Sequence, residues 1–187
     1  MEVIREILEG SEEDLTIVTT VDAFMDGLPD LSKLQEKVLF IENGQEMDLQ
    51  VLEEYLVRAG YEREEQTESP GQFAVRGGIL DIYPYTEEMP VRIEFWGDEV
   101  DSIRTFDPEN QRSIENLQEI TIYPSIEDEE EPGTVSFLDY FPKEKTILFL
   151  DEPQHLLEHA MTIELEVQES RKNREDVPLL FSTEQLM

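Results

Sequence analysis

The strongest constraint on the fold is a series of short, punctuated segments in the middle of the chain. Between residues 61 and 112, runs rich in β-branched and aromatic residues are separated by Gly-Gly, Pro and Gly-Asp: FAV, ILDIY, VRIEF and VDSIRTF. In VRIEF, apolar Val91, Ile93 and Phe95 alternate with Arg92, Glu94 and Trp96. Such alternation places one side on a core and the other toward solvent or a partner. The pattern predicts an antiparallel meander.

Helical periodicity and buried-type strands surround this region. Apolar spacing predicts an opening helix ended by Gly10, a short helix in VDAFMDGLPD, a helix near 47–59 and a long helix from about 154 to 175. LTIVTT (15–20) and TILFL (146–150) have the composition of strands buried in a parallel sheet, and KVLFIE predicts a strand before the Asn43-Gly44 turn.

These elements predict an α+β module with an antiparallel sheet, flanked by α/β segments. We expect residues 1–28 to be the end of a first α/β segment and residues 29–115 to be the module. Residues 116–187 would form a second α/β segment with a C-terminal helix.

Charge restricts the function. The 187 residues include 46 Asp and Glu against 14 Lys and Arg, a formal net charge of −32. Nonspecific binding to nucleic acid depends on Lys and Arg that displace counterions, so direct nucleic-acid binding is not expected. An acidic protein that mimics nucleic acid and occupies a basic partner stays open as an alternative.

The chain has no cysteine, which excludes disulfides and thiolate chemistry. No apolar run approaches the roughly 20 residues that span a bilayer, and the N-terminal MEVIREILEG contains acids where a secretory signal has a basic region. We therefore expect a cytoplasmic location and no membrane partner.

Catalytic motifs are few. His155, Glu158 and His159 fit the H-x-x-E-H pattern of some zinc hydrolases, which leaves a zinc-dependent hydrolase as an alternative, although no spacing identifies a third ligand. Asp151-Glu152 follows an apolar run, as the magnesium-binding acids of nucleotide hydrolases do, but the sequence has no phosphate-binding G-x-x-x-x-G-K-[ST] loop. The run of acids at 127–131 lacks the ligand spacing of a calcium loop. We expect no catalytic residues, no metal and no cofactor.

The cations of the β region are more informative. All five are Arg and none is Lys: Arg63, Arg76, Arg92, Arg104 and Arg112. The guanidinium fork suits carboxylates, and Arg is enriched in protein interfaces where Lys is depleted. About half of them would serve intramolecular ion pairs, and an Arg beside Gly-Gly and aromatic residues is a candidate hot spot.

Residues 60–113 resemble the bacterial transcription-repair coupling factor (Mfd) family and, more distantly, the excision-repair helicase UvrB. The matching parts occur in order: G-Y-E-R, P-G-x-F-A-V-R-G-G-I-L-D-I-Y-P, V-R-I-E-F-x-G-D-E and R-T-F-D-P-x-x-Q-R-S. Ala74 and Gly78 stand where UvrB carries an Arg and an acid, which favours the coupling factor.

The resemblance implies a non-catalytic module that binds UvrA, the damage-recognition ATPase, and recruits it to RNA polymerase stalled at DNA damage. It implies that Arg63 and Arg76 contact UvrA beside Phe73. The expected partner-binding residues are Arg63, Arg76, Phe73, Tyr61, Gly77 and Trp96. The resemblance also implies that the flanks are RecA-like and non-catalytic, and that RNA polymerase and double-stranded DNA are partners of the full-length protein.

Overall fold

The computed structural model describes residues 2–10, 14–126 and 133–171. The chain divides into two compact units. The first comprises residues 1–8 and 34–127, and the second comprises residues 9–33 and 128–187. No helix in the described ranges is long and apolar enough to cross a membrane.

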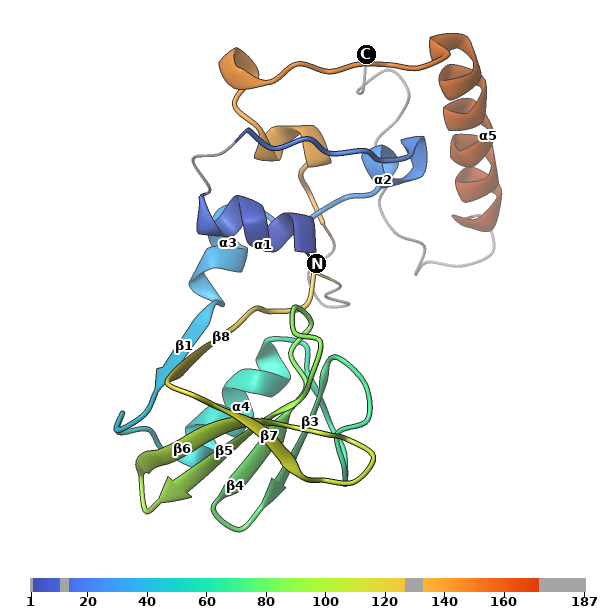
Figure 1. Cartoon of the computed structure of the whole chain (residues 1–187). Coiled ribbons are helices and arrows are strands. Elements are labelled where there is room, and N and C mark those ends of the chain that lie inside the picture. Colours follow the sequence, from blue (N-terminus) through green and yellow to red (C-terminus); the bar gives the residue numbers. More distant parts are fainter. Residues whose placement is uncertain (1, 11–13, 127–132, 172–187) are drawn as a thin grey trace. The chain divides into compact units, whose positions relative to one another are not determined.

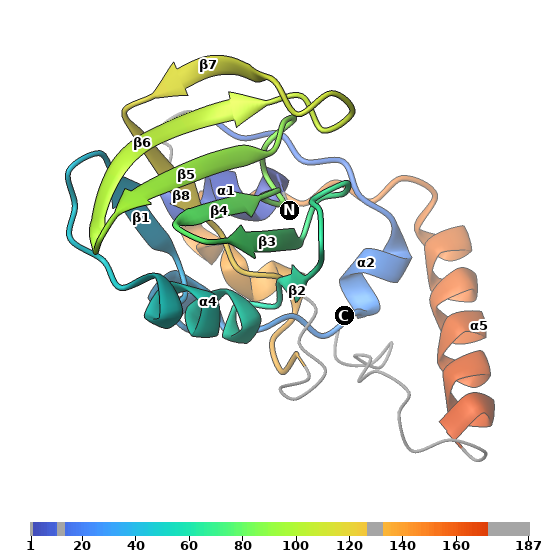
Figure 2. The same ribbon diagram turned by 90° about the horizontal axis from the view of Figure 1, so that it is seen from below.

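A six-stranded sheet forms the centre of the first unit. Its strands lie in the order β2-β3-β4-β5-β6-β7, and all neighbours are antiparallel except β2 and β3, which are parallel. Figure 2 shows these strands side by side, with α4 running along the sheet. Their bounds are β2 Glu62–Arg63, β3 Gln72–Arg76, β4 Ile79–Ile82, β5 Val91–Trp96, β6 Glu99–Phe106 and β7 Ser113–Leu117. The predicted meander is confirmed, with one parallel edge strand added.

Helix α4, Leu49–Arg58, covers one face of this sheet (Figure 1). It begins at Asp48, whose carboxylate accepts hydrogen bonds from the backbone N–H groups of Gln50 and Val51, an N-cap that satisfies donors without helical partners. Gly60, at φ +85°, follows its end. The core between helix and sheet includes Leu52, Leu56, Phe73, Leu80, Ile82, Val91, Ile93 and Ile103. The predicted helix near 47–59 is confirmed.

Two further strands form a separate antiparallel ladder. β1, Leu39–Glu42, pairs with β8, Glu119–Ile122, and buries Ile41 opposite Ile120. The predicted strand before the Asn43-Gly44 turn is therefore confirmed. The same unit contains all but the last residue of the opening helix α1, Glu2–Glu9, and part of α3, Leu31–Glu36.

The second unit is helical in its described part. It contains α2 Val21–Met25, η1 Phe137–Tyr140, η2 Lys143–Lys145 and α5 Pro153–Arg171. Phe137 packs edge-on against Phe24, and a backbone bridge joins Leu28 to Val135. The predicted long helix is present, and its expected end at 175 lies outside the described residues.

The predicted strands at 15–20 and 146–150 are wrong. Neither run belongs to a ladder in the described part of the chain, and Val18 and Phe149 are almost fully exposed. The physical reason is that an apolar, β-branched run becomes a strand only where another strand supplies its backbone hydrogen bonds.

Candidate protein-interaction surface

The β3–β4 hairpin presents Arg76 at one end of the sheet. Gly77 adopts φ +64° in the turn, where an L side chain would be strained. Gly78 lies against β5, because a Cβ there would stand 3.0 Å from the carbonyl oxygen of Phe95. Both glycines therefore shape the turn that follows Arg76.

Arg76 is half-exposed and held at one point. Its side chain is 47% exposed, and its Nη2 donates to Oδ2 of Asp81 at 2.5 Å. Asp81 lies on β4, and its side chain is only 2% exposed. A carboxylate at this depth requires hydrogen-bonding partners, because burial removes its water.

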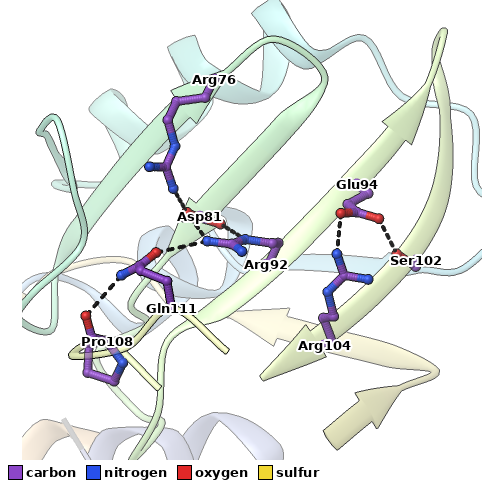
Figure 3. Close-up of polar contacts among 8 residues, drawn as sticks. All are labelled: Arg76, Asp81, Arg92, Glu94, Ser102, Arg104, Pro108 and Gln111. Atoms are coloured by element: carbon purple, nitrogen blue, oxygen red, sulfur yellow. Dashed lines mark hydrogen bonds and ion pairs between the residues drawn. The ribbon is translucent and has the colours of Figure 1, made fainter. Parts of the chain in front are cut away.

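Arg92 supplies most of those partners (Figure 3). Its Nε donates to Asp81 Oδ1 at 2.6 Å and its Nη2 donates to Asp81 Oδ2 at 2.8 Å, a bidentate pair. The same Nη2 donates to Oε1 of Gln111 at 3.0 Å, and the guanidinium lies 4.6 Å from the centre of the Phe106 ring. The hydrogen bonds that Arg92 donates to Asp81 raise the pKa of Arg92 above its ordinary value.

A second ion pair lies on the same face. Arg104 of β6 donates to Glu94 of β5, and the hydroxyl of Ser102 donates to the other oxygen of Glu94 at 3.2 Å. Arg92 and Arg104 are direct cross-strand neighbours, as are Asp81 and Arg92. Figure 3 shows the two pairs on adjoining strands. This face of the sheet is therefore polar and ordered by ion pairs.

Trp96 lies at the same end of the sheet as Arg76. Strands β3 and β5 are both antiparallel to β4, so their C-terminal residues lie at the same end of the sheet. Strand alternation places Trp96 on the face of Arg92 and Glu94, and its side chain is 83% exposed. The predicted alternation in β5 is confirmed, and an exposed indole accompanies an exposed guanidinium.

Arg63 lies on the other face. β2 pairs with β3 so that Arg63 stands opposite Phe73, whose side chain points into the core beneath α4. Nη1 of Arg63 approaches Oε2 of Glu53 on α4 at 2.6 Å, and the Arg63 side chain is 56% exposed. Arg63 and Arg76 are both accessible, but the structure does not bring them onto one face.

Phe73 and Tyr61 belong to the core. Phe73 is fully buried, and Tyr61 is almost fully buried with its hydroxyl donating to the carbonyl of Tyr123 at 2.8 Å. Burial raises the pKa of Tyr61. The expectation that these two side chains face a partner does not fit this burial, because neither lies at the surface of the free chain.

The zinc alternative finds no support. His155 and His159 are exposed, with Glu152 at 3.3 Å and Asp22 at 3.9 Å respectively, and no group of three or more metal-ligating side chains occurs within the described ranges. The acidic run at 127–131 lies outside those ranges.

Comparison with known proteins gives the family. Residues 39–127 match the model of the UvrB interaction domain. This segment is similar to the UvrB interaction domain. The chain is 42% identical over 127 residues to the transcription-repair-coupling factor of Bacillus subtilis, covering 68% of this chain and 11% of that protein. It is 40% identical over 119 residues to UvrABC system protein B of Thermosipho africanus, covering 63% and 18% of the two chains. The Escherichia coli coupling factor is 33% identical over 111 residues, covering 59% and 10%.

These matches confirm the resemblance to coupling factors and UvrB, which are DNA-repair proteins. The chain spans less than a fifth of the length of these relatives. The surface described above lies on strands β3 to β6 and therefore falls within the matched segment.

Sequence reasoning missed two residues of this surface, Asp81 and Glu53. Asp81 interrupts the apolar run Ile79–Ile82, and an acid in a buried strand signals a buried cationic partner. Glu53 carries no such signal, because its partner Arg63 is reached only through the folding of β2 against α4.

Proposed function

We propose that this chain is a non-catalytic docking module that binds UvrA through Arg76 and Arg63, with Trp96 adding apolar area at the same end of the sheet as Arg76. The observation that carries the proposal is the half-exposed guanidinium of Arg76 at the end of β3. A guanidinium has five N–H donors, and Asp81 accepts from one of them at Nη2 of Arg76. The exposed donors can bind a carboxylate on the partner.

The electrostatics support a protein partner. The chain carries a net charge of −32, so a phosphate backbone would be repelled. Exposed arginine and tryptophan side chains, such as those of Arg76 and Trp96 at one end of the sheet, are enriched in protein interfaces. The similarity of residues 39–127 to the UvrB interaction domain supports the same role.

The wider role extends the proposal to the full-length protein. There, docking of UvrA on this module would recruit it to RNA polymerase stalled at DNA damage, with polymerase and duplex DNA bound by other parts. The flanks would belong to a RecA-like, non-catalytic domain. A cytoplasmic location fits this role.

The test is binding of the whole chain to purified UvrA at near-physiological salt, with wild type compared with Arg76→Glu. We expect a loss of about 2 to 5 kcal/mol, because the reversal removes a hydrogen-bonded charge pair and adds repulsion. Arg112→Glu is the matched control, since Arg112 is exposed and follows β6, at the opposite end of the sheet.

Each other result has a distinct meaning. Equal binding by wild type and Arg76→Glu would move the interface away from β3, and no binding by wild type would remove UvrA as the partner. Binding that collapses with salt and ignores Arg76 would instead identify an acidic mimic of nucleic acid.

A further inference from the structure

The charges of Arg76, Asp81 and Arg92, on the outer face of the sheet, do not sum to zero. Arg76 and Arg92 both bond to Asp81, so two guanidinium groups surround one carboxylate. The cluster Arg76–Asp81–Arg92 therefore carries one net positive charge in a strongly acidic chain. By contrast, Arg104 with Glu94 and Arg63 with Glu53 are one-to-one pairs.

The two arginines of this cluster have different roles. Arg92 is 14% exposed and engages both oxygens of Asp81, so it supplies the neutralising charge. Arg76 is much more exposed and touches Asp81 through one nitrogen. Figure 3 shows the Arg76 guanidinium directed toward Asp81. Because nearly half of the Arg76 side chain is exposed, a partner can still reach it.

We infer that Asp81, neutralised by Arg92, is a positioning residue that orders the Arg76 guanidinium for a partner carboxylate without cancelling its charge. This rests on the proposed function. Ordering a long side chain before association removes part of the entropy that binding would otherwise lose. Without the hydrogen bond to Asp81, the Arg76 side chain would have the same charge but would bind the partner carboxylate with lower affinity.

The inference and simple electrostatics predict opposite changes in affinity for UvrA when the charge of Asp81 is removed. Asp81→Asn makes the surface more positive, so charge alone predicts tighter binding to a partner carboxylate. Positioning predicts weaker binding of the chain to purified UvrA, by about tenfold. Glu94→Gln is the matched control, because it makes the same charge change on the same face while its partner is Arg104. It should not reproduce the loss.

A double-mutant cycle separates positioning from general damage to the fold. In an Arg76→Ala background, Asp81→Asn should change the affinity for UvrA by less than about twofold, since the group it orders is gone. A tenfold loss that persists in that background would show a merely structural role and overturn the inference. Tighter binding by Asp81→Asn alone would overturn it as well.

Arg76→Ala distinguishes a failure of the proposed function from a failure of the positioning role of Asp81. If Arg76→Ala alone binds UvrA as wild type does, the Arg76 contact is wrong and the role of Asp81 is wrong with it. If Arg76→Ala binds weakly and Asp81→Asn binds normally, only the positioning role is lost.

A second measurement does not depend on the folding of a variant. In the free wild-type chain, the Nε–Hε order parameter of Arg76, measured by NMR relaxation, should be close to that of Arg92. A value typical of a freely rotating side chain, below about 0.6, would overturn the inference.

Discussion

Arg63 and Arg76 lie on opposite faces of the six-stranded sheet, although their strands β2 and β3 are direct neighbours. Arg63 pairs with Glu53 on the helix side, and Arg76 pairs with Asp81 on the outer side. A partner that contacts both must therefore enclose the β2 edge of the sheet. Strand β2 is only two residues long, so this edge is narrow.

This separation predicts independent contributions to binding. Arg63→Ala and Arg76→Ala should each weaken UvrA binding, and their effects should add to within about 0.5 kcal/mol because their ion-pair partners differ. Isothermal titration of the two single variants and the double variant measures this. A coupling above about 1 kcal/mol would mean that both arginines bind one group on the partner.

Glu53 should restrain binding through Arg63. Because Glu53 neutralises Arg63 at 2.6 Å, Glu53→Gln should strengthen UvrA binding by roughly two- to fivefold, which is the scale of an exposed ion pair. Glu54→Gln on the same helix is the charge-matched control. A similar gain in both variants would reduce the effect to net charge and would contradict a specific role of Glu53.

Gly71 and Gly44 form a matched pair for stability. Both have a positive φ, +88° and +82°, but a Cβ on Gly71 would lie 2.6 Å from the Tyr85 ring, whereas Gly44 has no atom within 4 Å. Gly44→Ala should lower the free energy of unfolding by about 1 kcal/mol through backbone strain alone. Gly71→Ala should lower it by a further 1 to 3 kcal/mol or so through the clash. Urea denaturation compares the two, and equal losses would mean that the ring moves away without cost.

Buried tyrosines predict a loss of stability at alkaline pH. Burial raises the pKa of Tyr55 to about 12 and also raises that of Tyr61. In the unfolded chain the two hydroxyls lose their protons near pH 10, the ordinary pKa of tyrosine, whereas the native chain keeps them. The free energy of unfolding therefore falls as pH rises from about 10 to 12.

Tyr61→Phe isolates one of these contributions. The variant loses the hydrogen bond to Tyr123, which should cost about 1 kcal/mol at neutral pH. Above pH 10 its free energy of unfolding should fall less steeply than that of wild type, by up to about 1.4 kcal/mol per pH unit. Urea unfolding at pH 8, 10 and 11 tests this, and parallel curves would show that Tyr61 ionises as in the unfolded chain.

The sequence predicted the elements whose signal is local. Helix α4 has an apolar face and a terminal Gly60, so its position followed from the chain itself. Strands β3 to β6 showed alternation and turn residues, and the predicted meander followed. Periodicity was sufficient because each of these elements buries its apolar side within the same unit.

Prediction failed where the structure depends on distant partners. The runs around Val18 and Phe149 have strand composition but no ladder in the described residues. The pairing of β1 with β8 joins segments about 80 residues apart, which no local pattern specifies.

The candidate site was predicted in part. Arg63, Arg76 and Trp96 are exposed as expected, whereas Phe73 and Tyr61 are buried. Motif proximity did not distinguish the two groups, because adjacent strand residues point to opposite faces and burial depends on which face α4 covers. Whether the exposed residues contact UvrA stays a prediction.

The side chain of Tyr85 connects Gly60 and Gly71, the two glycines that flank residues 61–70 before β3. Tyr85 donates from its hydroxyl to the carbonyl of Gly60 at 2.6 Å, and its ring fills the space over Gly71 and packs 4.8 Å from the ring of Tyr61. Arg63 lies between those two glycines. A genetic screen for loss of UvrA binding should therefore recover substitutions at Tyr85 and Gly71, which would act by displacing Arg63.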